Sequence, residues 1–332
     1  VLLTPESSLT VSHTGVLGLA ELALEQDGRQ VSYADFQWKG EAKLAADIGN
    51  GGLDLDMQGV MTGKDLGFAD ADYQLSYAGQ EWTGALTLQS AAGAGSTDIN
   101  LQGTITGNDL ALLIPAEALT VHHGGFLWDG TVTLESGEDT AVTADGRLQI
   151  SKLGGDVADS KMNLASIDDL SIENVGLLEN GDVTLTGMTV KSAVFAKDTA
   201  AADSKQDSGG SVLSAGVITV DSIQVTEGNQ VAIGLLEWRD VTSLIDRDPD
   251  GVWRPVRIVD TLPFANQDSE AKQPAAATAD EPAGRVMVGE IRVTGDSAIV
   301  LNDQTVKPPF NMRLTITEVL LKNIDNGQPD QD

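Results

Sequence analysis

Three copies of one seven-residue segment decide the fold: Trp38-Lys39-Gly40-Glu41-Ala42-Lys43-Leu44, Trp82-Thr83-Gly84-Ala85-Leu86-Thr87-Leu88 and Trp128-Asp129-Gly130-Thr131-Val132-Thr133-Leu134. The copies are 44 and 46 residues apart. Strand side chains alternate between two faces, so the Trp, the Gly, the aliphatic residue and the final Leu share one face. Each copy is predicted to be a strand with one apolar face. Its Gly is expected to be covered by the indole or by a side chain of a neighbouring strand.

A second strand repeats in step with the first: Leu55-Asp56-Met57-Gln58-Gly59-Val60-Met61, Ile99-Asn100-Leu101-Gln102-Gly103-Thr104-Ile105 and Val142-Thr143-Ala144-Asp145-Gly146-Arg147-Leu148. In the first two copies it continues into Thr-Gly-x-Asp-Leu, at residues 62–66 and 106–110. Two motifs that keep the same offset indicate a repeat architecture, in which neighbouring units share one continuous apolar surface.

Composition limits the classes of function. The chain has 332 residues and a net charge of -30, with 36 Gly and no Cys. Such a negative charge argues against nucleic acid and against electrostatic docking on anionic lipid headgroups. The absence of Cys excludes disulfides, zinc-thiolate sites and Cys nucleophiles.

The two ends of the sequence bear on whether it is part of a longer protein. No apolar run reaches the ~18 residues needed to cross a bilayer. The first residues, Val1-Leu2-Leu3-Thr4-Pro5, lack the basic start and hydrophobic segment of a signal peptide. We expect both ends to be cuts through a longer protein, with any anchor outside these residues.

Residues 8–160 are predicted to be a meander of antiparallel strands joined by short turns. The expected strands are Leu9–Ser12, Leu17–Glu25, Val31–Leu44, Leu53–Thr62, Tyr73–Tyr77, Glu81–Gln89, Asp98–Thr106, Ala118–His123, Leu127–Glu135 and Thr140–Ser151. The expected turns include Asp27-Gly28, Asn50-Gly51-Gly52, Ala78-Gly79, Gly124-Gly125 and Ser136-Gly137. The best apolar helix candidate, residues 110–119, is interrupted by Pro115.

The second part of the chain, residues 161–332, has a repeat of its own. The segment at residues 216–226 resembles the segment at 284–294, 68 residues later. Residues 196–211 and 265–283 are rich in Ala, Asp, Ser, Gln, Lys and Pro, so we expect flexible insertions there. The predicted organisation is therefore a β-repeat array at 1–160 followed by β-repeats with insertions at 161–332.

Two motifs are candidate metal sites. Asp246-Arg247-Asp248-Pro249-Asp250-Gly251 resembles the start of a calcium loop, but Arg257 stands where an EF-hand needs a carboxylate. A solvated turn is the favoured interpretation, and a calcium site is the alternative. His122 and His123 are adjacent in a predicted strand and point to opposite faces, so they cannot chelate one ion together.

No catalytic signature is present. The sequence has no His-Glu-x-x-His, Gly-x-Ser-x-Gly or P-loop motif. We therefore expect a protein that is not an enzyme, with no cofactor and no metal. An enzyme acting on envelope glycans would require carboxylates that converge in a cleft.

Two functions are possible, and they differ in what the repeated apolar face does. Either it is the sealed core of a structural β-rod, or it lines a trough that receives an apolar ligand. The candidate lining residues are Leu55, Met57, Met61, Leu86, Leu88, Ile99, Leu101, Ile105, Val132, Leu134, Val142 and Leu148.

Several segments together resemble the AsmA-like superfamily of Gram-negative bacteria, which includes the TamB-like and YhdP-like proteins. They are the Trp-x-Gly-x-x-x-Leu strand, the Thr-Gly-x-Asp-Leu ending, the Asp-Gly-x-Trp ending of residues 246–253, and a tail with Gly289 to Asp303 followed by Pro308-Pro309-Phe310-Asn311-Met312-Arg313-Leu314. The resemblance is stronger over residues 160–330 than over 1–160.

The resemblance implies an all-β, elongated and repetitive antiparallel sheet curled into a groove (β-taco). It also implies a periplasmic protein, anchored in the inner membrane by a segment outside this chain, that shields phospholipid acyl chains between the inner and outer membranes. Its partners would be lipid, both membranes and other envelope proteins, and members of the group lack catalytic residues. The alternative is a structural β-rod, an adhesin stalk or envelope-assembly scaffold with a sealed core.

Overall fold

The computed structural model is all-β and describes residues 8–26, 28–47, 49–90, 96–136, 140–157, 162–198, 210–226, 230–254, 256 and 285–326. Its strands are β1 (Ser8–Gln26), β2 (Arg29–Asp47), β3 (Gly52–Ala69), β4 (Gln74–Ser90), β5 (Thr97–Ile114), β6 (Leu119–Ser136), β7 (Thr140–Val157), β8 (Met162–Leu177), β9 (Val183–Asp198), β10 (Ser211–Thr226), β11 (Gln230–Arg247), β12 (Val286–Thr294), β13 (Ser297–Asp303), β14 (Phe310–Ile316) and β15 (Val319–Asp325). A 3-10 turn, η1 (Pro115–Glu117), separates β5 from β6.

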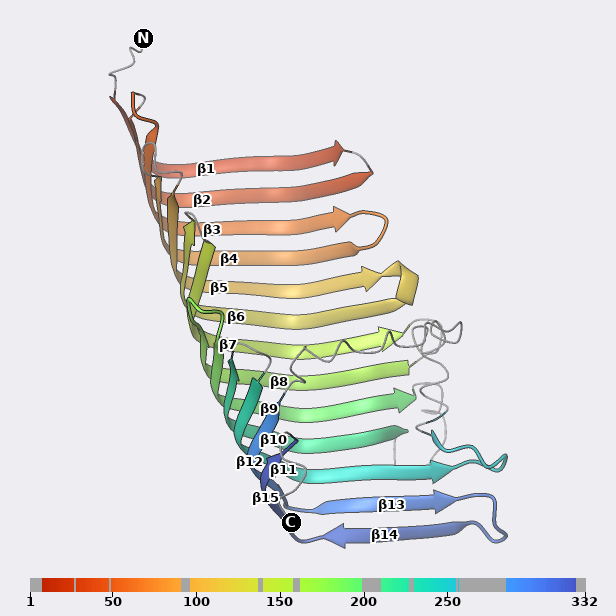
Figure 1. Cartoon of the computed structure of the whole chain (residues 1–332). Helices are drawn as coiled ribbons and strands as arrows, with labels where there is room; N and C mark the ends of the chain where they lie inside the picture. Colours follow the sequence, from red (N-terminus) through yellow and green to blue (C-terminus); the bar gives the residue numbers. More distant parts are fainter. Residues whose placement is uncertain are drawn as a thin grey trace, which may run out of the picture. The chain divides into compact units, whose positions relative to one another are not determined.

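The strands form one 15-stranded, mostly antiparallel sheet (Figure 1). From β1 to β11 every strand pairs with its neighbours in chain order. The predicted antiparallel meander is confirmed in this respect, because β1–β2, β2–β3 and β3–β4 are antiparallel pairs with short connections. The later strands depart from a meander, because β12 and β13 both run parallel to β11.

The strands are longer than predicted, because two of the expected turns lie inside strands. Ala78-Gly79 belongs to β4 and Gly124-Gly125 to β6, so each joins two expected short strands into one. The physical reason is packing. A Cβ on Gly79 would lie 2.9 Å from Asn108 Oδ1, and a Cβ on Gly124 would lie 2.9 Å from Lys152 Cδ. These glycines make room for a neighbouring side chain rather than turning the chain.

The chain divides into two compact units. Unit 1 comprises residues 1–110, 125–149 and 172–185, and unit 2 comprises residues 111–124, 150–171 and 186–332. The predicted boundary at residue 160 concerns the sequence repeats, and it stays a prediction. The expected insertions at 196–211 and 265–283 lie largely or wholly outside the described residues.

In unit 1 the repeated strands pair so that equivalent positions form rows across the sheet. Trp38 pairs with Met61, which pairs with Trp82. Ala42, Met57 and Leu86 form a parallel row, as do Leu44, Leu55 and Leu88. The 44-residue spacing is therefore the length of two strands with their turns, and it places equivalent positions two strands apart in the same row.

A row of glycines crosses unit 1 between these rows. Gly15 pairs with Gly40, Gly40 with Gly59 and Gly59 with Gly84. The atoms nearest to a Cβ on Gly40, Gly84 or Gly130 are backbone atoms of the adjacent strand, so the predicted covering of these glycines by an indole or a side chain is wrong. Gly146 meets an indole as well as backbone, since a Cβ there would lie 2.7 Å from Trp128 Cζ2 and 2.9 Å from the Cα of Gly130.

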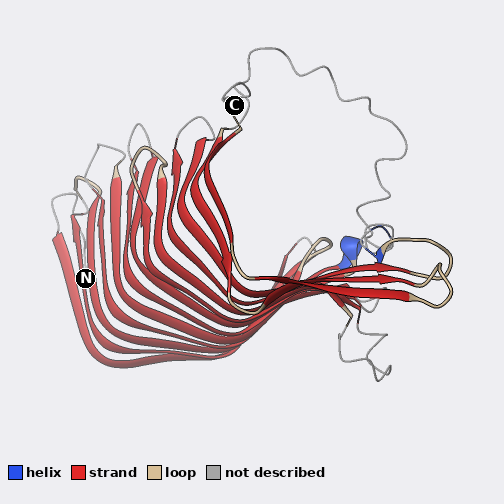
Figure 2. Cartoon of the chain, turned by 90° about the horizontal axis from the view of Figure 1, so that it is seen from below, coloured by secondary structure: helices blue, strands red, loops and turns tan. Residues whose placement is uncertain are grey.

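Every odd-numbered strand from β1 to β11 also holds a non-glycine residue with positive φ. In unit 1 these are Glu21 (φ 57°), Asp65 (φ 51°) and Asp109 (φ 54°), and β7, β9 and β11 carry Lys152, Ser192 with Ala196, and Asp240. The left-handed conformation interrupts the extended backbone, and Asp tolerates it better than most residues. The strands nearest the N-terminus bend sharply along their length (Figure 2).

Unit 2 has its own small core. Val190, Ala193, Ala215 and Ile218 are buried together, with Phe195, Leu236 and Trp238 packed around them. The two similar segments near residues 216–226 and 284–294 lie in β10 and β12, on either side of β11. β10 is antiparallel and β12 is parallel to β11, so the two copies run in opposite directions.

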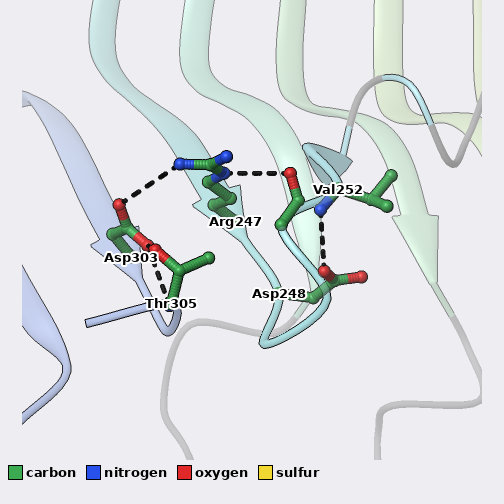
Figure 3. A network of polar contacts seen from close by, with 6 residues as sticks. Arg247, Asp248, Val252, Asp303 and Thr305 are labelled. Atoms are coloured by element: carbon green, nitrogen blue, oxygen red, sulfur yellow. Dashed lines mark hydrogen bonds and ion pairs between the residues drawn. The ribbon is translucent and has the colours of Figure 1, made fainter. Parts of the chain in front are cut away.

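The candidate calcium segment forms the turn that follows β11 (Figure 3). Asp248 Oδ1 accepts a hydrogen bond from the Val252 N–H (2.8 Å), and Arg247 Nε donates to the Gly251 carbonyl (2.9 Å). Asp246 instead points to Arg254, whose Nη2 lies 2.7 Å from its carboxylate. The carboxylates of Asp246 and Asp248 are thus engaged with residues outside the motif, and Asp246 also accepts a hydrogen bond from Asn302 Nδ2 (3.0 Å).

Candidate functional site

Unit 1 contains a concave apolar cavity of ≈ 420 Å³ on the face that carries the repeated aliphatic residues. Side chains and backbone of β2, β3, β4 and β5 line it. The lining residues are Tyr33, Phe36, Met57, Met61, Gly63, Leu66, Tyr77, Gln80, Glu81, Trp82, Leu86, Leu101 and Ile105. The cavity has the size and the predominantly apolar wall of a small-molecule site.

Five of the predicted lining residues meet in this cavity: Met57, Met61, Leu86, Leu101 and Ile105. Leu55 and Leu88 pair with each other two positions further along the same face, outside the cavity. Ile99, Val132, Leu134, Val142 and Leu148 lie on β5, β6 and β7 and do not line it. The structure brings together the candidates from β3 to β5 and leaves the others apart from this cavity.

The predicted lining residues remain partly accessible. None of the twelve is fully buried, and Met61 and Val142 are 37% and 40% exposed. Side chains that form a sealed core are normally inaccessible to solvent. Trp38 and Trp82 differ, with 2% and 5% exposure, so the indoles are the buried part of this face.

The aromatic wall of the cavity was missed from the sequence. Tyr33 covers Gly63, where a Cβ would lie 2.6 Å from the phenol oxygen, and Tyr77 covers Gly107 in the same way. Tyr33 and Tyr77 are 44 residues apart, as are the two glycines. The repeat spacing was the signal that could have identified them, and it also explains the Gly of Thr-Gly-x-Asp-Leu.

The left-handed backbone conformation at Asp65 explains why a strict alternation of side chains between the two faces missed these tyrosines. Met57, Met61 and Gly63 occupy odd positions along β3, but the next lining residue after Asp65 is Leu66. On β4, opposite this kink, Tyr77 lines the cavity together with Gln80 and Trp82. The inward face therefore shifts by one residue at the kink, which a strict period of two does not predict.

The polar groups of the cavity are few and carry little charge. Tyr33 donates its O–H to Gln80 Oε1. Burial raises the pKa of Tyr33 and that of Tyr77, because desolvation disfavours the phenolate. Both phenols are therefore protonated at neutral pH. Glu81 is the one carboxylate among the lining residues, which include no Lys, Arg or His.

On β5, the face opposite Leu101 and Ile105 is polar. Asn100 Nδ2 donates to Thr133 Oγ1 (3.1 Å), Thr104 Oγ1 donates to Asp129 Oδ1 (3.1 Å), and Arg147 forms an ion pair with Asp129 (3.1 Å). These contacts connect β5, β6 and β7 through exposed or half-buried groups. Unit 1 thus combines an apolar face with a face held together by hydrogen bonds.

A second cavity, of ≈ 580 Å³, has a wall rich in Thr, Asn and carboxylate groups. Asp145 and Glu179 both line it, and Asn174 Nδ2 donates to Asp145 Oδ2 (3.1 Å). An enzyme acting on glycans, one of the alternatives, would require two carboxylates in a cleft such as this. That hydrogen bond occupies one oxygen of Asp145.

The first histidine of the pair has a carboxylate neighbour. His122 Nδ1 lies 3.4 Å from Asp156 Oδ2, an ion pair when the imidazole is protonated. Within the described ranges, no three His, Asp or Glu side chains are grouped so that they could hold an ion. The same ranges contain no helix of the length and hydrophobicity that a membrane span requires.

Comparison with family models, with curated proteins and with solved structures found no match for this chain.

Proposed function

We propose that this chain is a segment of a lipid-transfer bridge that shields phospholipid acyl chains in an apolar groove between two membranes. The observation that carries the proposal is the half-buried stripe of Met57, Leu86, Leu101 and Ile105 around the cavity of unit 1. Such a stripe offers an alkyl chain an apolar contact surface within this cavity, whose lining residues include a single charged side chain, Glu81.

The energy of exposing lipid to water makes such a groove useful. Each exposed CH₂ costs ~0.8 kcal/mol, so an acyl chain of ~16 carbons costs about 12 kcal/mol in water. A protein that moves lipid across an aqueous space must therefore cover the chain along the whole path. A uniform aliphatic lining removes this cost without a deep pocket that would trap the lipid.

The polar face and the acidic charge fit the same role. Hydrogen bonds such as Asn100–Thr133 connect the outward side chains, and the net charge of -30 favours solubility. The proposed setting is the periplasm of a Gram-negative bacterium, with membrane attachment through regions outside this chain. This setting rests on the resemblance to the AsmA-like superfamily.

A structural β-rod is the second candidate, and the indoles favour it. Trp38 and Trp82 are almost completely buried and flank Met61, so they close part of the apolar face. If such packing extended along the whole face, the sheet would have a sealed core and no route for lipid.

Lipid analysis of the purified chain tests the proposal. The protein is expressed with export to the periplasm, purified without detergent, and studied by native mass spectrometry and by solvent extraction. Phospholipid bound at about one molecule or more per chain supports the bridge. A lipid-free protein that also takes up no lipid from vesicles supports the rod.

A further inference from the structure

Two side chains that line the cavity each carry a nitrogen atom without a hydrogen-bond acceptor. These atoms are Gln80 Nε2 and Trp82 Nε1, both on β4 and both buried. The Gln80 amide is oriented by its other end, because Oε1 accepts the hydrogen bond from the Tyr33 hydroxyl. A buried N–H group without an acceptor is unfavourable, so an acceptor supplied by a ligand would remove this penalty.

The two donors lie between two apolar stretches of the wall, and Leu66 and Tyr77 form one of these stretches. Gln80 pairs with Gly63 on β3. Trp82, two residues further along β4, pairs with Met61. Beyond the glycine row, on the same face, are Met57 and Leu86. The cavity therefore offers hydrogen-bond donors between two apolar stretches, which matches a molecule whose alkyl chain carries a neutral oxygen part of the way along it.

The charges of the cavity select among such molecules. The wall includes Glu81 but no cationic side chain, and the whole chain carries a charge of -30. An ionised carboxylate or a phosphate would meet repulsion without a compensating partner. A neutral carbonyl accepts hydrogen bonds without that cost. Tyr33 and Tyr77 remain neutral as well, since burial raises the pKa of each phenol.

We propose that this cavity binds the neutral ester carbonyl of a fatty acyl chain, with Gln80 as the principal donor and the alkyl chain along Met57, Leu86 and Leu101. The inference rests on the proposed function and adds a chemical preference to it. The phosphate of a phospholipid would lie outside the cavity, and the groove would hold lipid at a defined position rather than at any point along its length.

Competition binding with the full chain tests this preference. The probe is a pyrene-labelled acyl methyl ester, and the competitors are methyl decanoate, sodium decanoate and dodecane, which matches the ester in length. Gln80→Leu removes the donor at similar volume. Gln102→Leu is the matched control, because Gln102 is exposed and does not line the cavity.

We expect Gln80→Leu to weaken methyl decanoate binding roughly threefold to tenfold, the value of one neutral hydrogen bond, and to leave dodecane binding unchanged or stronger. Gln102→Leu should change neither, and decanoate should compete less well than its ester. Equal losses for ester and alkane, or no loss for either, would overturn the ester preference. If Gln80→Leu does not fold, Gln80→Met replaces it with the same expectations.

The two proposals fail differently. If the wild-type chain binds ester and alkane equally well, and Gln80→Leu does the same, the groove binds lipid without an ester site. If the wild-type chain binds neither compound, both the lipid-transfer function and the ester site are wrong.

Discussion

Gly40 and Gly59 lie opposite each other on β2 and β3, and a Cβ on Gly40 would lie 2.7 Å from the Cα of Gly59. The reverse distance, from a Cβ on Gly59 to the Cα of Gly40, is 2.8 Å. Side-chain atoms do not approach a backbone this closely. The repeated glycines are therefore a requirement of how tightly these strands approach.

The first prediction concerns this glycine row. Gly59→Ala and Gly84→Ala should each destabilise unit 1 by about 2 kcal/mol or more, because the added methyl group meets backbone that cannot move aside cheaply. Urea denaturation followed by circular dichroism measures the change. Gly18→Ala is the control, since the atoms nearest to a Cβ there would be 3.8 Å away. Equal effects at all three positions would contradict the steric explanation.

The second prediction concerns the kink at Asp65, whose φ is 51°. Asp65→Gly should leave the stability unchanged or raise it slightly, because Gly adopts this conformation without steric cost. Asp65→Val should lower it by about 1–2 kcal/mol, because a β-branched residue is disfavoured there. The difference between the two variants in thermal unfolding is the decisive quantity. A stable Val variant would mean that the kink is not imposed by the fold.

The third prediction separates the two faces of β5. Leu101→Asp should abolish lipid binding, because it places a carboxylate in the apolar cavity. Asn100→Asp should be tolerated, because Asn100 lies on the polar face, where the Thr133 hydroxyl can donate to the new carboxylate. Lipid extraction after purification reports both. Equal sensitivity of the two positions would rule out a one-sided groove.

The fourth prediction concerns the ion pair that anchors the end of β11. Asp246 is 3% exposed, and Arg254 binds both its carboxylate and the Gly210 carbonyl, each at 2.7 Å. Arg254→Met should destabilise unit 2 by about 3 kcal/mol, because it leaves a buried carboxylate with fewer partners. Asp246→Asn with Arg254→Met should recover part of the loss in a double-mutant cycle. Additive effects would show that the pair does not act as a unit.

The fifth prediction concerns acid stability. The hydrogen bond from the Thr305 side chain lowers the pKa of Asp303, and the one from the Asn50 side chain lowers the pKa of Asp47. In each case the folded-state pKa lies below that of the unfolded chain. The stabilising contribution is therefore complete above the ordinary pKa of Asp and is lost as the pH falls through the folded-state value.

A comparison of Asp303→Asn with the wild-type chain tests this sign. The difference in urea midpoint should be clear at pH 7 and should shrink toward about pH 3, as the carboxylate becomes protonated. A difference that is independent of pH would indicate that the charge of Asp303 does not contribute.

The apolar face was predictable from the sequence, because Trp82 and Leu86 are two of the positions that strand alternation assigns to one side. The turns at Asn50-Gly51 and after Asp70 have a local chemical cause, since the Asp47 and Asp70 carboxylates accept hydrogen bonds from the turn. Ala78-Gly79 was wrongly assigned for a related reason. Gly serves both turns and close packing, and only the position of Asn108 distinguishes the two.

The cavity itself was only partly predictable. Met57, Leu101 and Ile105 follow from the period of two, whereas Tyr33 and Tyr77 lie where the inward face shifts by one residue at the Asp65 kink. A positive φ at a non-glycine residue leaves no clear mark in a single sequence. The parallel pairing of β12 with β11 was also missed, because it depends on how residues far apart in the chain meet.

Site-specific photo-crosslinking in cells tests the central claim most directly. A benzophenone amino acid replaces Leu101 on the apolar face or Asn100 on the polar face, and crosslinked phospholipid is detected by mass spectrometry after irradiation. We predict that the Leu101 position crosslinks to phospholipid and that the Asn100 position does not. Crosslinking at neither position, in a protein that folds and is exported, would contradict the proposal that lipid occupies this groove.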